Sequence, residues 1–201
     1  MRSLTSFLPD LVPIFGISEQ AIYERQRALV RIGMLAAPKG RGRGSGVEAT
    51  PGTVARLLVA VLATDNLSDT DERVHKLALA PFTATDKRAS KSGGAKWDRC
   101  PWTGAQTFVD ALAFLLSPEA PILPAPKPGA HTSVRVYRGS LGASIGFVWS
   151  RRPGKGRSEF GQPDYAANNR IKVEAQLPFE ALRAIHQRLN FGERDEHASQ
   201  P

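Results

Sequence analysis

Five polar residues between positions 19 and 31 recur at the spacing of a single helix face. At about 100° per residue, with Ile22 at zero, Ala28 and Leu29 fall within one broad apolar arc, and the five polar residues fall on the opposite arc. An amide, a phenolic hydroxyl and guanidinium groups on one rigid surface match the chemistry of reading base edges in the major groove of DNA. The five residues are Gln20, Tyr23, Glu24, Arg27 and Arg31.

The helix that would carry these residues has a clear start signal. Ser18 can cap it, and Glu19 would lie in its first turn, so we expect a helix from Ser18 through about Met34. Arg25 falls inside the apolar arc. We therefore expect Arg25 to snorkel to a carboxylate or a phosphate rather than to read a base.

A short basic segment follows this helix. Lys39, Arg41 and Arg43 alternate with glycines between Pro38 and Gly46, so that backbone and cationic side chains can both approach phosphates. The segment could be an ordered hairpin or a flexible loop, and in either form it would contact phosphates.

The stretch from Leu8 to Gly46 resembles the winged helix–turn–helix proteins, and in particular regulators of the phage and prophage kind. Gly16-Ile17-Ser18 matches the turn, Glu19 to Arg31 the recognition helix, and Pro38 to Gly46 the wing. The resemblance implies sequence-specific binding of double-stranded DNA. Its site would comprise Ser18, the five polar residues of the helix, and Lys39, Arg41 and Arg43 of the wing.

Only seven residues precede Leu8, too few for the helix that usually opens this fold. Either the helix expected after Thr50-Pro51 completes the bundle, or the domain is incomplete. Further helices are expected from Ser68 or Asp69 through Leu77, over Phe108–Leu116, and from Pro178 through Leu189. Strands are expected around Val134–Val136, Ala143–Trp149 and Ile171–Gln176. The first two of these strands should form a hairpin.

These elements predict an α+β protein with two modules. Residues 1–80 would form the winged helix–turn–helix-like domain, residues 81–104 a basic linker, and residues 105–201 a small α+β domain with an antiparallel hairpin and a C-terminal helix. Because specific operators are generally read by dimers, the second module would serve to dimerise the chain or to bind an effector.

Composition supports a polyanionic partner and offers little to catalysis. The formal net charge is +8, and a single cysteine, Cys100, excludes disulfide frameworks and cysteine-based metal sites. The four histidines lack metal-ligand spacing, and Gly154-Lys155-Gly156 lacks the flanking residues of a phosphate-binding loop. No apolar run approaches the ~20 residues of a membrane span. We expect a cytoplasmic, nucleoid-associated protein without catalytic residues, metal or cofactor.

The expected function is transcriptional regulation through sequence-specific DNA binding. Two other hypotheses about function stay open. The chain could be a phage DNA-packaging or assembly component that uses the same fold, or a nucleic-acid-processing enzyme with its chemistry in the C-terminal module. No carboxylate cluster of recognisable spacing follows Thr132. A dimer would favour regulation, and a larger ring would favour packaging.

Overall fold

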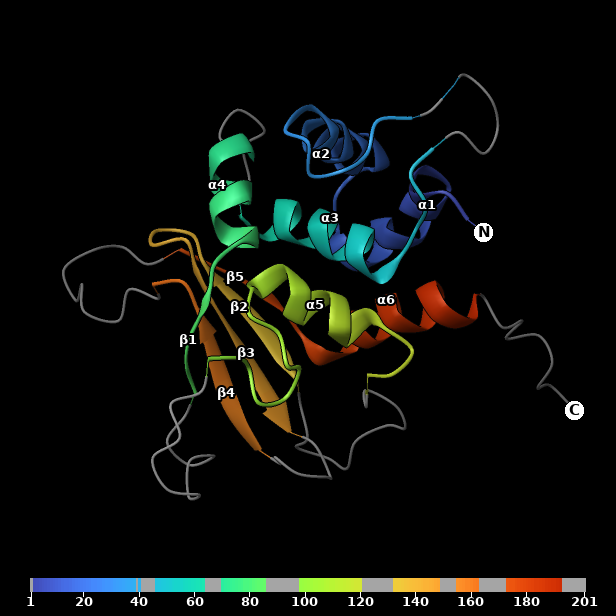
Figure 1. Ribbon diagram of the computed structural model, residues 1–201. Helices are drawn as coiled ribbons and strands as arrows, with labels where there is room; N and C mark the ends of the chain where they lie inside the picture. Colours follow the sequence, from blue (N-terminus) through green and yellow to red (C-terminus); the bar gives the residue numbers. More distant parts are fainter. Residues whose placement is uncertain are drawn as a thin grey trace, which may run out of the picture.

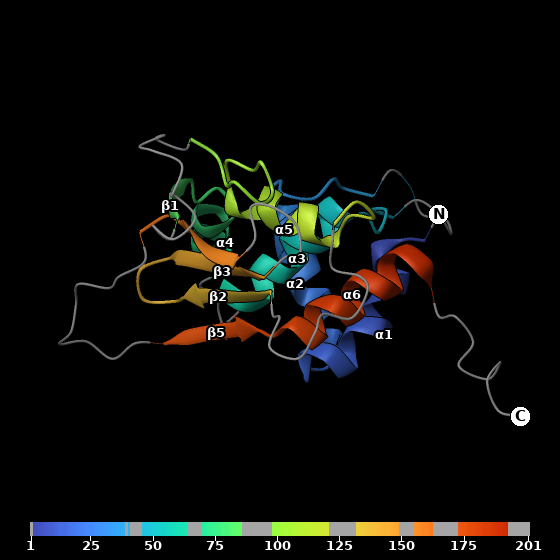
Figure 2. The same cartoon turned by 90° about the horizontal axis from the view of Figure 1, so that it is seen from below.

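The computed structural model describes residues 2–38, 40, 46–63, 70–85, 98–120, 132–148, 155–162 and 173–192. Along the chain its elements are α1 (Leu4–Phe15), α2 (Glu19–Arg31), α3 (Pro51–Ala63), α4 (Thr70–Ala78), β1 (Phe82–Thr85), α5 (Phe108–Leu116), β2 (Ser133–Tyr137), β3 (Gly142–Val148), β4 (Lys155–Phe160), β5 (Glu174–Leu177) and α6 (Phe179–Phe191). The α+β class is therefore confirmed. The helices gather to one side of the sheet, and α6 lies beside α1 (Figures 1 and 2).

The strands form one antiparallel sheet in the order β1-β4-β3-β2-β5. In β2, Val134 and Val136 are buried while their neighbours along the strand are partly exposed, which is the alternation of a sheet with one covered face. The expected hairpin is confirmed as β2 and β3, with Tyr137 opposite Gly142. The third expected strand is β5, which pairs with the other edge of β2.

Two strands were not expected. Phe82–Thr85, which lies within the expected linker over 81–104, forms β1, and Lys155–Phe160, for which no strand was expected, forms β4. The Oγ1 atoms of Thr83 and Thr85 donate to the carbonyl oxygens of Glu159 and Arg157, at 3.2 Å and 3.0 Å. Residues 82–85 thus belong to the sheet, and Cys100 and Trp102 from the same expected linker are buried in the core.

The first helix starts at Leu4, four residues before the stretch with the helix–turn–helix resemblance, because Ser3 caps it: the Oγ atom of Ser3 accepts from the backbone N–H of Ser6 at 3.1 Å. The helix continues through Pro9 and Pro13, whose side chains lie on its exposed side. Residues 2–4 then pair with residues 47–49: Leu4 N–H donates to Val47 O, and Ala49 N–H donates to Arg2 O. This pairing brings the start of α3 back to the start of α1.

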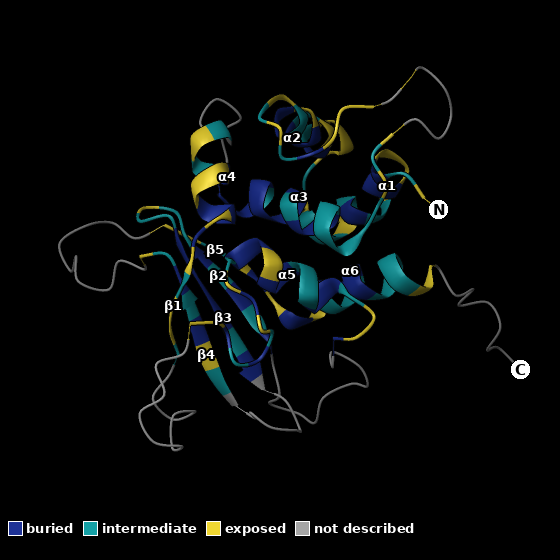
Figure 3. Ribbon diagram, viewed as in Figure 1, coloured by how far each residue is buried: buried dark blue, intermediate teal, exposed yellow. Residues whose placement is uncertain are grey.

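Helix α3 lies at the centre of the packing. Its start follows the expected signal, since Thr50 Oγ1 accepts from Thr53 N–H at 3.2 Å and Pro51 opens the helix. Its buried side chains are Val54, Ala55, Leu57, Leu58, Val59, Ala60, Leu62 and Ala63, and it packs against α2, α4 and α5. Buried residues from both predicted modules thus belong to one hydrophobic cluster (Figure 3). Whether residues 1–80 and 105–201 are separate folding units stays a prediction.

Candidate nucleic-acid interface

Two helices joined by a short turn stand at the start of the described chain. Helix α1 ends at Gly16, whose φ of 66° is a left-handed conformation that favours glycine, and three residues later α2 begins at Glu19. The Oγ atom of Ser18 caps α2 by accepting from Ala21 N–H at 3.2 Å. Two helices joined by a short glycine-containing turn form the core of many DNA-binding domains.

The inner side of α2 anchors it firmly. Ile22 and Leu29 are fully buried and Ala28 is nearly so, as the sequence periodicity predicts. Gln26 is also buried, and its Nε2 donates to Thr5 Oγ1 on α1 at 3.0 Å. The positions of residues around α2 do not predict this contact of Gln26, because its hydrogen-bond partner, Thr5, lies on another helix.

Arg25 lies on this inner side, 6% exposed, as the arc arithmetic predicts. Its Nη1 donates to the carbonyl oxygen of Ala21, one turn earlier in the same helix, at 3.0 Å. A guanidinium held there is directed away from the outer face of α2. That Arg25 also reaches a carboxylate or a phosphate stays a prediction.

The outer face of α2 presents polar side chains to solvent. Gln20, Tyr23 and Arg27 are exposed, and Glu24 between them is partly exposed. The Glu24 carboxylate accepts from Gln20 Nε2 at 2.7 Å and from Arg27 Nη1 at 3.3 Å. α2 lies on the side of α3 that faces away from α5 (Figure 1). Four of the predicted site residues therefore share one accessible surface.

The fifth predicted residue of this face has a partner within the chain. Arg31 is exposed, but its Nη2 atom forms an ion pair with Asp71 Oδ1 on α4 at 2.6 Å, and its Nε lies 3.2 Å from Oδ2. This bidentate contact and the charge of Asp71 raise the pKa of Arg31. The pair fixes the end of α2 to α4 and engages the Nε and Nη2 atoms of Arg31, so fewer of its N–H groups remain for DNA.

The predicted wing residues Lys39, Arg41 and Arg43 lie outside the described residues. What is described is the return from this segment, where residues 47–49 pair with the N-terminal segment. The role of the three basic side chains therefore stays a prediction.

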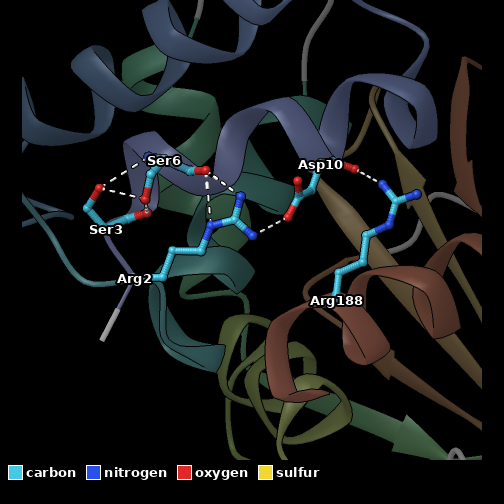
Figure 4. Close-up of polar contacts among 5 residues, drawn as sticks. All are labelled: Arg2, Ser3, Ser6, Asp10 and Arg188. Atoms are coloured by element: carbon cyan, nitrogen blue, oxygen red, sulfur yellow. Dashed lines mark hydrogen bonds and ion pairs between the residues drawn. The ribbon is translucent and has the colours of Figure 1, made fainter. Parts of the chain in front are cut away.

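A cluster of polar side chains holds α1 against α6 (Figure 4). Arg2 forms an ion pair with the Asp10 carboxylate and donates from Nε to Ser6 O at 3.0 Å, while Arg188 on α6 donates to the Asp10 carbonyl oxygen. Because Asp10 receives both arginines, α6 is attached directly to α1. These arginines are engaged in holding the fold.

Other chemistry finds little support in the described part of the chain. No group of three or more His, Cys, Asp or Glu side chains there could hold a metal ion, and no helix described is long and apolar enough to cross a membrane. Cys100 is buried with its Sγ atom 3.2 Å from Ser158 Oγ, an environment typical of a structural thiol.

Comparison with protein-family models, with curated proteins and with solved structures found no match to this chain. The candidate nucleic-acid interface is therefore inferred from the geometry of the described residues.

Proposed function

We propose that this chain binds double-stranded DNA sequence-specifically through the outer face of α2 and acts as a transcriptional regulator of the phage or prophage kind. In this proposal the protein is cytoplasmic, associates with the nucleoid and carries out no catalysis of its own. The cation excess of the whole chain favours association with a polyanion.

One observation carries the proposal: α2 is fixed on one side and free on the other. Ile22 and Leu29 are buried against the core, and α2 packs on α1, α3 and α4, while Gln20, Tyr23 and Arg27 extend into solvent. Base reading requires side chains of this type on a helix that does not move relative to its domain.

The start of α2 fits contact with the DNA backbone. Ser18 is exposed, and the first N–H groups of a helix point outward with a partial positive charge that attracts phosphate. In helix–turn–helix proteins the N-terminal part of the recognition helix enters the major groove. Gln20 and Tyr23 lie in this part of α2, so Ser18 would bind a phosphate while Gln20 reads a base.

We further propose that the chain binds as a homodimer, since two recognition helices read a palindromic operator one helical turn apart. Sedimentation of the protein with and without its duplex would give the oligomeric state. A ring larger than a dimer would support a packaging component instead.

The test of DNA binding is a selection of bound duplexes from a random pool at one fixed salt concentration. The parent should enrich a motif, and Gln20→Ala or Arg27→Ala should weaken preference at one or two positions by about 1–3 kcal/mol each. Arg157→Ala, which removes an exposed arginine from β4, is the charge-matched control and should preserve the motif. A parent that binds DNA without enriching any motif would contradict regulation and support a packaging or protective role.

A further inference from the structure

Glu24 lies at the centre of the outer face of α2 and bonds both of the side chains that we propose to read bases. Its Oε1 atom accepts from Gln20 Nε2 at 2.7 Å and from Arg27 Nη1 at 3.3 Å, and its Oε2 atom lies 3.3 Å from the same Arg27 nitrogen. The three residues belong to consecutive turns of one helix. They form a network, which we call the Gln20–Glu24–Arg27 triad.

We infer that Glu24 is a positioning residue that makes Gln20 and Arg27 read two purines as one unit. This inference rests on the proposed function, because it concerns how the same face of α2 selects its DNA. It assigns Glu24 a role different from direct base contact, which the residue type alone would suggest through a bond from cytosine N4.

The contact with Glu24 fixes the orientation of the Gln20 amide. A carboxylate only accepts hydrogen bonds, so it holds the NH₂ group of Gln20 toward itself and disfavours the flipped amide, which would place two oxygens together. One N–H and the Oε1 atom of Gln20 are left for DNA. This donor and acceptor, in a fixed order, match the N7 and N6 groups of adenine.

Arg27 is constrained in the same way. Its Nη1 atom is bonded to Glu24, whereas its side chain is 65% exposed. The remaining N–H groups of the guanidinium form a planar fork, and a fork of this type recognises O6 and N7 of guanine. Glu24 also neutralises part of the charge on Arg27, which reduces non-specific attraction to phosphate and leaves the fork for a base.

The triad also sets the distance between the two bases. Since Gln20 Nε2 and Arg27 Nη1 bond the same oxygen at 2.7 Å and 3.3 Å, the two nitrogens lie no more than 6.0 Å apart. Successive base pairs are about 3.4 Å apart along the duplex. The adenine and the guanine should therefore be neighbours or be separated by a single base pair.

The experiment measures the affinity of the full chain for the duplex enriched by the parent and for single-base variants of that duplex. Glu24→Ala should reduce discrimination about five- to tenfold at both the adenine and the guanine, although Gln20 and Arg27 are unchanged. Combining Gln20→Ala with Glu24→Ala should cost no more at the adenine than Gln20→Ala alone. Thermal unfolding should change little, because Glu24 is partly exposed and its contacts with Gln20 and Arg27 lie within one helix.

Glu19→Ala is the matched control, because it removes the same charge from the exposed side of the same helix. It should raise overall affinity about as much as Glu24→Ala does and leave base preference unchanged. Loss of preference at both positions in Glu24→Ala alone supports the inference. Unchanged preference, or a change confined to a third position such as a cytosine, overturns it. A parent that enriches no motif instead contradicts the proposed function itself.

Discussion

At the scale of single residues, His186 shows how burial determines the chemistry of a side chain. It is buried on α6, where its Nε2 lies 2.9 Å from the carbonyl oxygen of Ser117 at the end of α5. A carbonyl can only accept, so Nε2 carries the proton and Nδ1 is an unprotonated nitrogen without a hydrogen-bond partner among the described residues. Burial lowers the pKa of His186, and the bond to Ser117 opposes this effect only in part.

This environment predicts how stability depends on pH. Because the folded-state pKa lies below the ordinary value of 6.5, the unfolded chain binds the proton more readily, and stability should fall as the pH drops below about 6.5. The loss should end once the pH is below the folded-state pKa. Urea midpoints measured at pH 7.5, 6.5 and 5.5 give the slope. His186→Gln keeps a donor for Ser117 but cannot titrate, so an equal slope in this variant would show that other groups cause the effect.

At the scale of elements, the sequence identified structure wherever the pattern was local. The exposed face of α2 and the buried arc through Ile22 and Leu29 follow from helical periodicity alone. The end of α2 does not follow from this periodicity. Gly33 adopts a φ of 74°, and the N–H groups of Met34 and Leu35 both donate to the carbonyl oxygen of Leu29. This left-handed turn stops the helix at Arg31, before the expected Met34.

Contacts between distant segments explain the remaining differences. β1 has four residues and β4 reads as a polar basic stretch, so neither has a strand signal of its own; each is stabilised by the other. In the candidate interface, the pairing of Arg31 with Asp71 joins residues forty positions apart. Periodicity within one helix cannot show such a partner.

The Arg31–Asp71 pair gives a prediction for DNA affinity. Both side chains are largely exposed, so Asp71→Asn should change stability little. It should also release Arg31 toward DNA and make the slope of log K against log salt more negative by about 0.9, the value of one added phosphate contact. Titrations at several salt concentrations measure this. Glu72→Gln, which frees Lys76 on the same helix, is the control for the change in charge, and an equal shift in both variants would exclude a specific role for Arg31.

The burial of α3 predicts that its side chains contribute strongly to the free energy of unfolding. Leu58 is fully buried, so Leu58→Ala should lower the free energy of unfolding by about 2–5 kcal/mol. Leu79, 50% exposed after the end of α4, offers the matched substitution, and Leu79→Ala should cost about 0.5 kcal/mol or less. Denaturant unfolding compares the two. Equal losses would mean that α3 is not the centre of the core.

At the scale of the whole molecule, one hydrophobic core supports α2. Buried residues of α1, α2 and α3 join those of α5, α6 and the sheet in one cluster, and Arg188 attaches α6 to Asp10 of α1. The surface of α2 is thus held by elements from both halves of the chain.

The last prediction concerns where the positive charge of the chain lies, in the basic segment that follows α2 or spread over the whole molecule. The triple change of Lys39, Arg41 and Arg43 to Ala should weaken binding to every DNA sequence alike, because phosphate contacts carry no sequence information. If each of the three residues displaces one counterion, the slope of log K against log salt should become less negative by about 2.7. The control removes the same charge elsewhere, by changing Arg99, Arg135 and Arg157 to Ala. Equal slopes for the two triple variants would show that DNA responds to the net charge of the chain and not to a basic segment beside α2.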